Sequence, residues 1–163
     1  MTPELLAETL GDHLNRLFRA AWALCGRRED AEDLVQETYV RVLAKPRTIR
    51  AADEALPYLL GVLRNTYVSG VRTRSRRPKT VPIEDSEQRL PARPGESPAA
   101  ALEARELFAV IARLPGDQRD VIVAVDVAGL SYAEAAEGLD VPIGTVMSRL
   151  YRGRDAVARA IQG

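Results

Sequence analysis

Five prolines interrupt the middle of the chain, at positions 78, 82, 91, 94 and 98. Proline lacks a backbone N–H and its ring clashes with the preceding turn, so neither a continuous helix nor a central strand can cross this stretch. The stretch also lacks apolar periodicity, which is typical of a linker. The sequence therefore predicts an N-terminal domain over residues 1–77, a linker over 78–98 and a C-terminal domain over 99–163. About twenty linker residues span at most ~70 Å, which lets the two domains bind separate sites on a larger partner.

The first half has the apolar spacing of helices. Leu10, Leu14, Leu17 and Ala21 form the stripe of a core-facing helix, which Gly26 ends. We expect a second helix from about residue 30 until the proline at 46, and a third over about 54–72. The core face of the second helix is predicted to carry Val35, Tyr39, Val42 and Leu43.

The second half restarts with a helix cap. Ser97 is followed by proline, the usual order at a helix start, and an amphipathic stripe then continues to Leu114. Three further helices are expected, ending near 129, 138 and 161. Aromatic residues make up only 5% of the chain, so the cores must be aliphatic. The predicted fold class is all-α, with two small helical domains.

Residues 129–154 have the pattern of a helix-turn-helix. Ser131 and Glu134 can form a capping box, residues 138–141 a tight turn, and the proline at 142 the start of a second helix. The N-terminal end of such a second helix can enter a DNA major groove. Thr145, Ser148 and Arg152 are spaced to share one face of it. Short hydroxyls and arginines are suited to contacts with phosphates and bases.

Charge is separated along the chain although the formal net charge is zero. The segment 29–37 carries five acidic residues and no basic one, and the segment 64–79 carries six basic residues and no acidic one. An acidic surface and a basic surface on one chain indicate two kinds of partner.

Motifs in both halves of the chain resemble one known family. The residues LP at 114–115, GLSY at 129–132 and VPIGTVMSRL at 141–150 are similar to the DNA-binding region four of extracytoplasmic-function (ECF) sigma factors, members of the sigma-70 family. Departures are Ala135 for isoleucine, Met147 for a basic residue and Gly153 for alanine. In the first half, AEDLVQET at 31–38 resembles the region-two signature. YLLGVLRN at 58–65 resembles the helix that engages the minus-ten element, with Tyr58 in place of tryptophan and Gly61 in place of arginine.

The resemblance implies partners and site residues. It implies binding to core RNA polymerase, at the clamp helices of the largest subunit and at the flap, and binding to promoter DNA, with an anti-sigma factor as regulator. The polymerase-binding residues would be Asp33, Leu34, Gln36 and Glu37, with Leu34 as part of the packing. The minus-ten residues would be Tyr58, Arg64, Asn65, Arg72, Arg74, Arg76 and Arg77, together with the loop 47–53. The minus-thirty-five residues would be Ser131, Thr145, Ser148, Arg149, Arg152 and Arg154.

Other functions have weaker support in the sequence. Cys25 and His13 are the only residues of their types, so no intramolecular disulfide or structural zinc site is expected, and Cys25 is predicted to be a small buried hydrophobe. We expect no cofactor, no enzymatic activity and no membrane insertion, and hence a cytoplasmic protein. Two alternatives remain: a stand-alone dimeric helix-turn-helix regulator, and a metal-dependent nucleic-acid enzyme using Asp30, Glu32 and Asp33.

Overall fold

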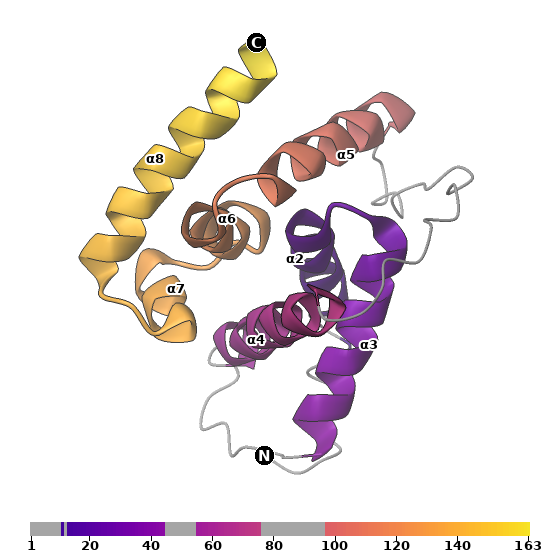
Figure 1. Ribbon diagram of the computed structural model, residues 1–163. Helices are drawn as coiled ribbons and strands as arrows, with labels where there is room; N and C mark the ends of the chain where they lie inside the picture. The colour runs from indigo at the N-terminus through magenta and orange to yellow at the C-terminus, as the bar shows by residue number, and fades with distance from the viewer. Residues whose placement is uncertain (1–10, 12, 45–54, 76–96) are drawn as a thin grey trace.

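The computed structural model describes residues 11, 13–44, 55–75 and 97–163, with the backbone alone from 71 to 75. Every regular element in these ranges is helical, which confirms the predicted all-α class (Figure 1). The predicted linker lies outside the described residues up to position 96, as do the start of the first helix and the loop 47–53. The elements are α2(Leu14–Cys25), α3(Arg28–Ala44), α4(Ala55–Ser75), α5(Pro98–Ala112), α6(Gly116–Ile122), the π-helical turn η2(Val123–Val127), α7(Tyr132–Leu139) and α8(Ile143–Gln162).

Helices α2, α3 and α4 pack on one another in the first half. Leu17 and Trp22 of α2 are almost fully buried, and the Trp22 ring meets Phe18 edge-on at 5.6 Å between ring centroids. Gly26 ends α2 in the left-handed region at φ 78°, and its N–H bonds to the Trp22 carbonyl. Cys25 is half-buried against the core, so it is less enclosed than the sequence predicted.

Leu43 of α3 was predicted to face the core but is exposed. Val35 and Val42 are buried as expected, but Leu43 is 50% exposed. At 100° per residue Leu43 is rotated away from the Val35 side, and the adjacent Val42 already fills the core position in that turn.

The helices of the second half begin at the capping residues that the sequence analysis identified. The Ser97 hydroxyl accepts the Ala100 N–H at 3.1 Å, and Pro98 is the first helical residue. The Ser131–Glu134 capping box has both of its bonds, at 3.1 and 2.9 Å. Asp140 then turns the chain in the left-handed region at φ 55°, and α8 follows. The capping box at the start of α7 and the left-handed residue at its end thus define the helix-turn-helix of α7 and α8.

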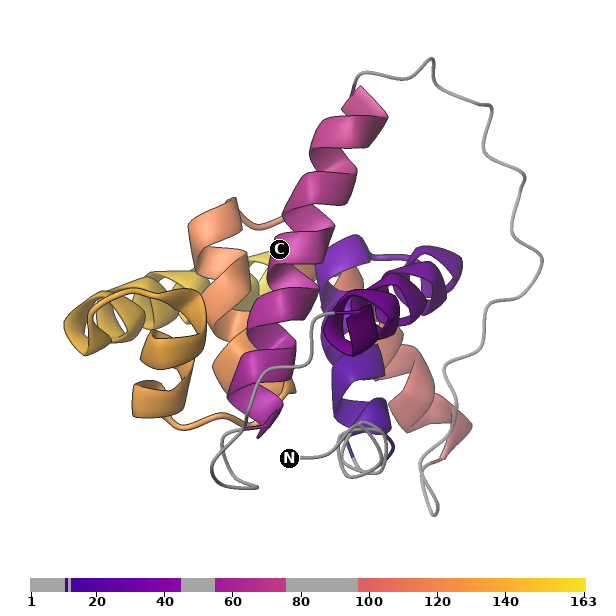
Figure 2. The ribbon, with the colours of Figure 1, turned by 90° about the horizontal axis from the view of Figure 1, so that it is seen from below.

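A single apolar core connects the two halves. Helix α2 packs against α5 and η2, and α4 packs against α7. Figure 2 shows α4 standing between the α2–α3 pair and the orange helices of the second half. The sequence predicted two domains bound to separate sites, and it gave no sign that their cores are continuous in the unbound chain.

Candidate polymerase- and DNA-binding surfaces

The acidic residues of α3 form an exposed face. Asp33, Gln36 and Glu37 are all exposed, and Glu37 is paired with Arg41 of the next turn at 3.3 Å. Leu34, the fourth predicted polymerase-binding residue, is only 7% exposed and belongs to the core. The structure therefore brings three of the four predicted polymerase-binding residues to the surface and gives Leu34 a packing position beneath them.

Two apolar side chains lie beside these acids. Val40 is 66% exposed, and Leu43 lies within the same two turns of α3. Val40 follows Asp33 by seven residues, which places it almost directly in line along the helix. A surface with charged residues next to uncovered aliphatic ones is typical of a protein-binding site. The sequence analysis assigns Leu43 to the core face of this helix and makes no prediction for Val40.

The predicted minus-ten residues of α4 have three different environments. Tyr58 is half-buried and packs against the core. Asn65 is exposed and its amide oxygen accepts from Arg64 Nη1 at 3.3 Å. Arg64 also donates from Nε to Asp120 of α6 at 3.0 Å. The structure describes only the backbone at Arg72 and Arg74, and Arg76 and Arg77 lie outside the described residues.

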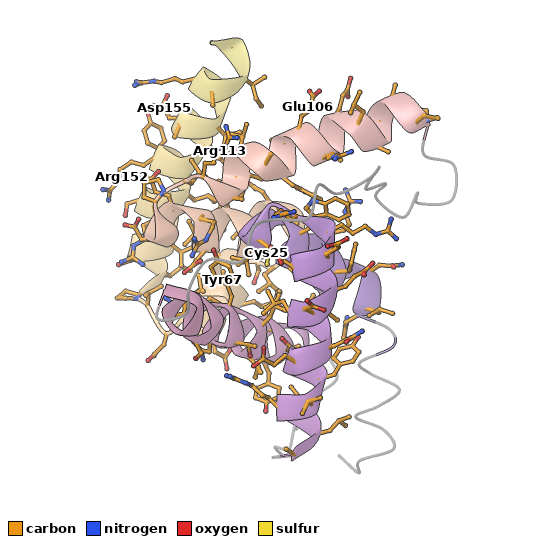
Figure 3. The ribbon with its side chains drawn as sticks, turned by 45° about the vertical axis from the view of Figure 1, so that its right-hand side comes forward. Cys25, Tyr67, Glu106, Arg113, Arg152 and Asp155 are labelled. Carbon is orange, nitrogen blue, oxygen red and sulfur yellow. The ribbon has the colours of Figure 1, made fainter. Side chains whose placement is uncertain are left out.

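Helix α8 buries one side and exposes the other. Val146 and Leu150, which the helical spacing predicts to face the core, are buried at 0% and 2% exposure. The opposite side exposes Ser148 and Arg152, and Figure 3 shows Arg152 pointing away from the helices. Thr145 is half-buried at its edge. The first three turns of α8 therefore offer a polar surface of a kind that fits a major groove.

Two further residues on this side of α8 were not predicted. Tyr151 is 77% exposed and Met147 52% exposed, one turn apart. Together with Tyr132 of α7 they line a shallow hollow. Apolar side chains can contact the thymine methyl group in the major groove. The signal in the sequence is Met147 itself, an apolar residue where the family pattern has a basic one.

The remaining predicted minus-thirty-five residues have partners within the chain. Arg154 binds both carboxylate oxygens of Asp126 in η2, at 3.0 and 2.7 Å, and this hydrogen bonding raises the pKa of its guanidinium. Arg149 lies 3.9 Å from Asp117. Ser131 uses its hydroxyl to cap α7. Their contact with DNA stays a prediction.

An apolar groove runs between α5 and the later turns of α8. It has a volume of about 500 Å³. Leu107, Phe108 and Ile111 line one side and Val157 and Ile161 the other, with the Asp126–Arg154 pair also on its wall. The apolar lining makes this groove a candidate for protein binding rather than nucleic-acid binding.

The described helices carry neither a metal-binding cluster nor a membrane span. Within the described ranges, no cluster of three or more metal-ligating side chains is found, Asp30, Glu32 and Asp33 included. None of the helices described is both long and apolar enough to cross a bilayer.

The described helices thus combine a helix-turn-helix, a plan typical of DNA-binding proteins, with an exposed acidic face on α3. Comparison with known families narrows this class. The sigma-70 region 2 family matches residues 10–77, and the sigma-70 region 4 family matches residues 104–157. The chain belongs to the ECF sigma factors of the sigma-70 family, and it is accordingly a DNA-binding transcription initiation factor.

Similar proteins cover most of the chain. The ECF sigma factor EcfG of Rhodopseudomonas palustris is 34% identical over 142 residues, which are 85% of this chain and 75% of the relative. SigE of Mycolicibacterium smegmatis is 35% identical over 90% of this chain, which spans only 58% of that relative. Among solved structures, the sigma factor RpoE in complex with the anti-sigma factor NepR from Bartonella quintana has the same fold, with a TM-score of 0.70 at 24% identity and 96% coverage of both chains.

Proposed function

We propose that this chain binds core RNA polymerase through the acidic face of α3 and recognises promoter DNA through α4 and α8. The observation that carries the proposal is the coexistence, on one chain, of an exposed acidic face on α3 and an exposed helix α8 that follows a capped helix α7 in a helix-turn-helix. A stand-alone regulator would need only the helix-turn-helix. The process requires binding and strand capture but no covalent step, and its site of action would be the cytoplasm.

On α3, the contact is proposed to combine charge and apolar burial. Asp33 and Glu37 would face basic residues of the polymerase clamp, and Val40 and Leu43 would lose their exposure on docking. Burial of aliphatic surface supplies affinity, whereas the carboxylates accelerate and orient the encounter. Leu34 acts by holding α3 on its own core.

On α8, the proposed base-reading set is Thr145, Ser148, Met147, Tyr151 and Arg152. Arg152 provides hydrogen-bond donors, and the Ser148 hydroxyl, which donates to the Thr145 carbonyl at 3.1 Å, provides an acceptor. Met147 and Tyr151 provide apolar contact that favours thymine. Arg154 has a different role in this proposal. Its bidentate pair with Asp126 ties α8 to η2 and so fixes the angle at which the recognition helix leaves the domain.

The groove between α5 and α8 is proposed as the contact for the polymerase flap. Its apolar lining is what a protein segment requires, and its position leaves the recognition face of α8 uncovered. One structurally similar protein was solved with the anti-sigma factor NepR, and another, CnrH, was solved with the cytosolic domain of CnrY. We propose that an anti-sigma factor also holds this chain inactive by covering polymerase-binding surfaces.

Run-off transcription with the core polymerase of the same organism tests the proposal. The chain should convert the core enzyme into one that starts at defined positions, and mapping those starts yields the promoter. Tight binding to duplex DNA by the chain alone, with no effect on the core enzyme, would instead identify a stand-alone regulator.

A further inference from the structure

Helix α8 carries four arginines, and most of them are paired with acidic residues of the chain itself. The pairs are Arg149 with Asp117, Arg154 with Asp126, and Arg159 with Asp155. The last pair lies within α8, but the acids of the first two belong to α6 and η2, and α6 packs alongside α8 (Figure 1). Within the described residues, Arg152 is the arginine of α8 that no ion pair holds. The segment α6–η2 therefore neutralises two of the four positive charges of α8.

The two pairs that reach across to α6–η2 lie on opposite flanks of α8. At about 100° per residue, Arg149 lies about 60° to one side of Arg152, and Arg154 about 160° to the other side. The buried residues Val146 and Leu150 lie between these two directions. The two arginines therefore flank the exposed side of α8 almost symmetrically.

These flanks are where DNA phosphates would lie. The major groove is about 12 Å wide and an α-helix with its side chains about 10–12 Å, so a helix in the groove has a phosphate backbone close to each flank. Arginine binds carboxylates and phosphates through the same kind of charged oxygens. Asp117 and Asp126 thus offer to Arg149 and Arg154 what the two DNA strands would offer.

The two pairs differ in strength. Asp126 accepts Arg154 Nε at 3.0 Å and Nη2 at 2.7 Å, which is the bidentate geometry that a phosphate also allows. Asp117 lies 3.9 Å from Arg149 Nε, its side chain is 52% exposed, and it also accepts the Gln118 N–H at 2.9 Å. The pair on one flank is therefore tight, and the pair on the other is loose and readily exchanged.

We propose that Asp117 and Asp126 compete with DNA phosphates at the two flanks of α8 and thereby set the affinity of the chain for duplex DNA. This inference rests on the proposed role of α8 in promoter binding. An arginine that contacts a phosphate has to leave its carboxylate, which then faces the DNA without a partner. The gain from counterion release is smaller for such an arginine. Arg152 has no such competitor, so its contacts supply a larger share of the affinity.

Salt-dependent binding of the full chain to a short fluorescent duplex of arbitrary sequence tests the competition. Asp117→Asn and Asp126→Asn keep the shape of the side chain and remove the charge that holds the arginine. Each should tighten duplex binding about threefold, which is the equilibrium equivalent of an exposed ion pair. Each should also steepen the plot of log affinity against log salt concentration by about 0.9 for the arginine set free.

Glu137→Gln is the matched control. Glu137 is exposed on α7, in the same helix-turn-helix, and takes part in none of the ion pairs of the described residues. Its replacement changes the net charge equally but frees no arginine, so the salt slope should stay that of the parent chain. In an Arg149→Gln background, Asp117→Asn should have only the effect of this control. A slope change in Glu137→Gln equal to that in Asp117→Asn would refute competition through the pair.

A purely structural role for the pairs predicts different results. Asp126→Asn would then lower the melting temperature and leave the salt slope unchanged, which would remove Asp126 from the proposal. The same unchanged slope in Asp117→Asn, whose loose and exposed pair contributes little to folding, would overturn the proposal as a whole.

The promoter that run-off mapping defines adds a second comparison. Phosphate contacts carry no sequence information, so the variants should bind promoter and unrelated duplex more tightly by the same factor. A gain confined to the promoter would show that the freed arginines contact bases, and would overturn the competition for phosphates. Failure of the proposed function is a separate result, because it abolishes run-off transcription whatever the salt slopes are.

Discussion

Gly153 of α8 gives a quantitative test of how the recognition helix is seated. The ECF pattern commonly has alanine here, and from the sequence this departure looked harmless. In the structure Gly153 is buried, and a methyl group on it would lie 2.9 Å from Cγ1 and 3.2 Å from Cδ1 of Ile122. Ile122 is itself 2% exposed and has a stiff, β-branched side chain. The added carbon therefore has to move α8 or distort Ile122.

Two opposing terms set the size of the effect of Gly153→Ala. Alanine is favoured over glycine in a helix interior by about 1 kcal/mol. Overpacking a buried contact costs about 1–3 kcal/mol. The packing term is the larger, so the free energy of unfolding should fall by about 0–2 kcal/mol. Gly70→Ala of α4, where a methyl group meets nothing within 4 Å, gains the first term alone, and the difference between the two variants should therefore be about 1–3 kcal/mol.

Urea unfolding followed by circular dichroism measures both variants on the full chain. A double substitution adds a second check, because Ile122→Ala removes the two atoms that obstruct the methyl group. In that background Gly153→Ala should become neutral or stabilising, which is a coupling of about 1–3 kcal/mol between the positions. If Gly153→Ala were as stabilising as Gly70→Ala in the parent chain, the close packing of α8 on α6 would be refuted.

Three further substitutions separate the proposed surfaces. Asp33→Ala should lower the affinity for core polymerase, measured by pull-down, without changing promoter-DNA binding by the helix-turn-helix. Glu106→Ala, at an exposed position of α5, is the charge-matched control. An equal loss of polymerase binding in the two variants would count against the α3 face as the docking site. Arg152→Ala should weaken binding to promoter duplex, measured by fluorescence anisotropy, by about 1–3 kcal/mol without changing the stability of the chain. Arg154→Ala should also lower the free energy of unfolding, measured by thermal unfolding, because Asp126 loses its partner. A loss of stability in Arg152→Ala but not in Arg154→Ala would mean that Arg152 is the structural residue and Arg154 the DNA ligand. Tyr151→Ala should relax selectivity at a thymine position by about tenfold, and uniform weakening across promoter variants would exclude base reading.

Local features were predictable from the sequence because their causes are local. The capping box at Ser131, the cap at Ser97 and the buried positions Val146 and Leu150 all follow from interactions within one or two helical turns. The same reasoning failed at Leu43, where two adjacent aliphatic residues compete for one core position and spacing alone does not say which wins.

Contacts between distant segments were not predictable in the same way. Nothing near Arg154 in the sequence indicates Asp126, and nothing near Arg64 indicates Asp120, because those pairs are 28 and 56 residues apart. Their consequence is functional: arginines counted as DNA ligands from the sequence already have carboxylate partners in the unbound chain. An arginine in such a pair must exchange one anion for another on binding DNA, so its net contribution is smaller than that of an exposed arginine such as Arg152.

The glycines show how a sequence departure can still point to a distant contact. Gly61 and Gly153 both stand where the ECF pattern has a larger residue, and both lie where a Cβ would meet another helix. A missing side chain carries no chemistry of its own, so a search for functional residues passes over it. It does, however, require that something else approach the backbone there, since glycine in a helix interior otherwise only destabilises. In this chain the approaching groups are Ile122 of α6 at Gly153 in α8 and the α7 backbone at Gly61 in α4.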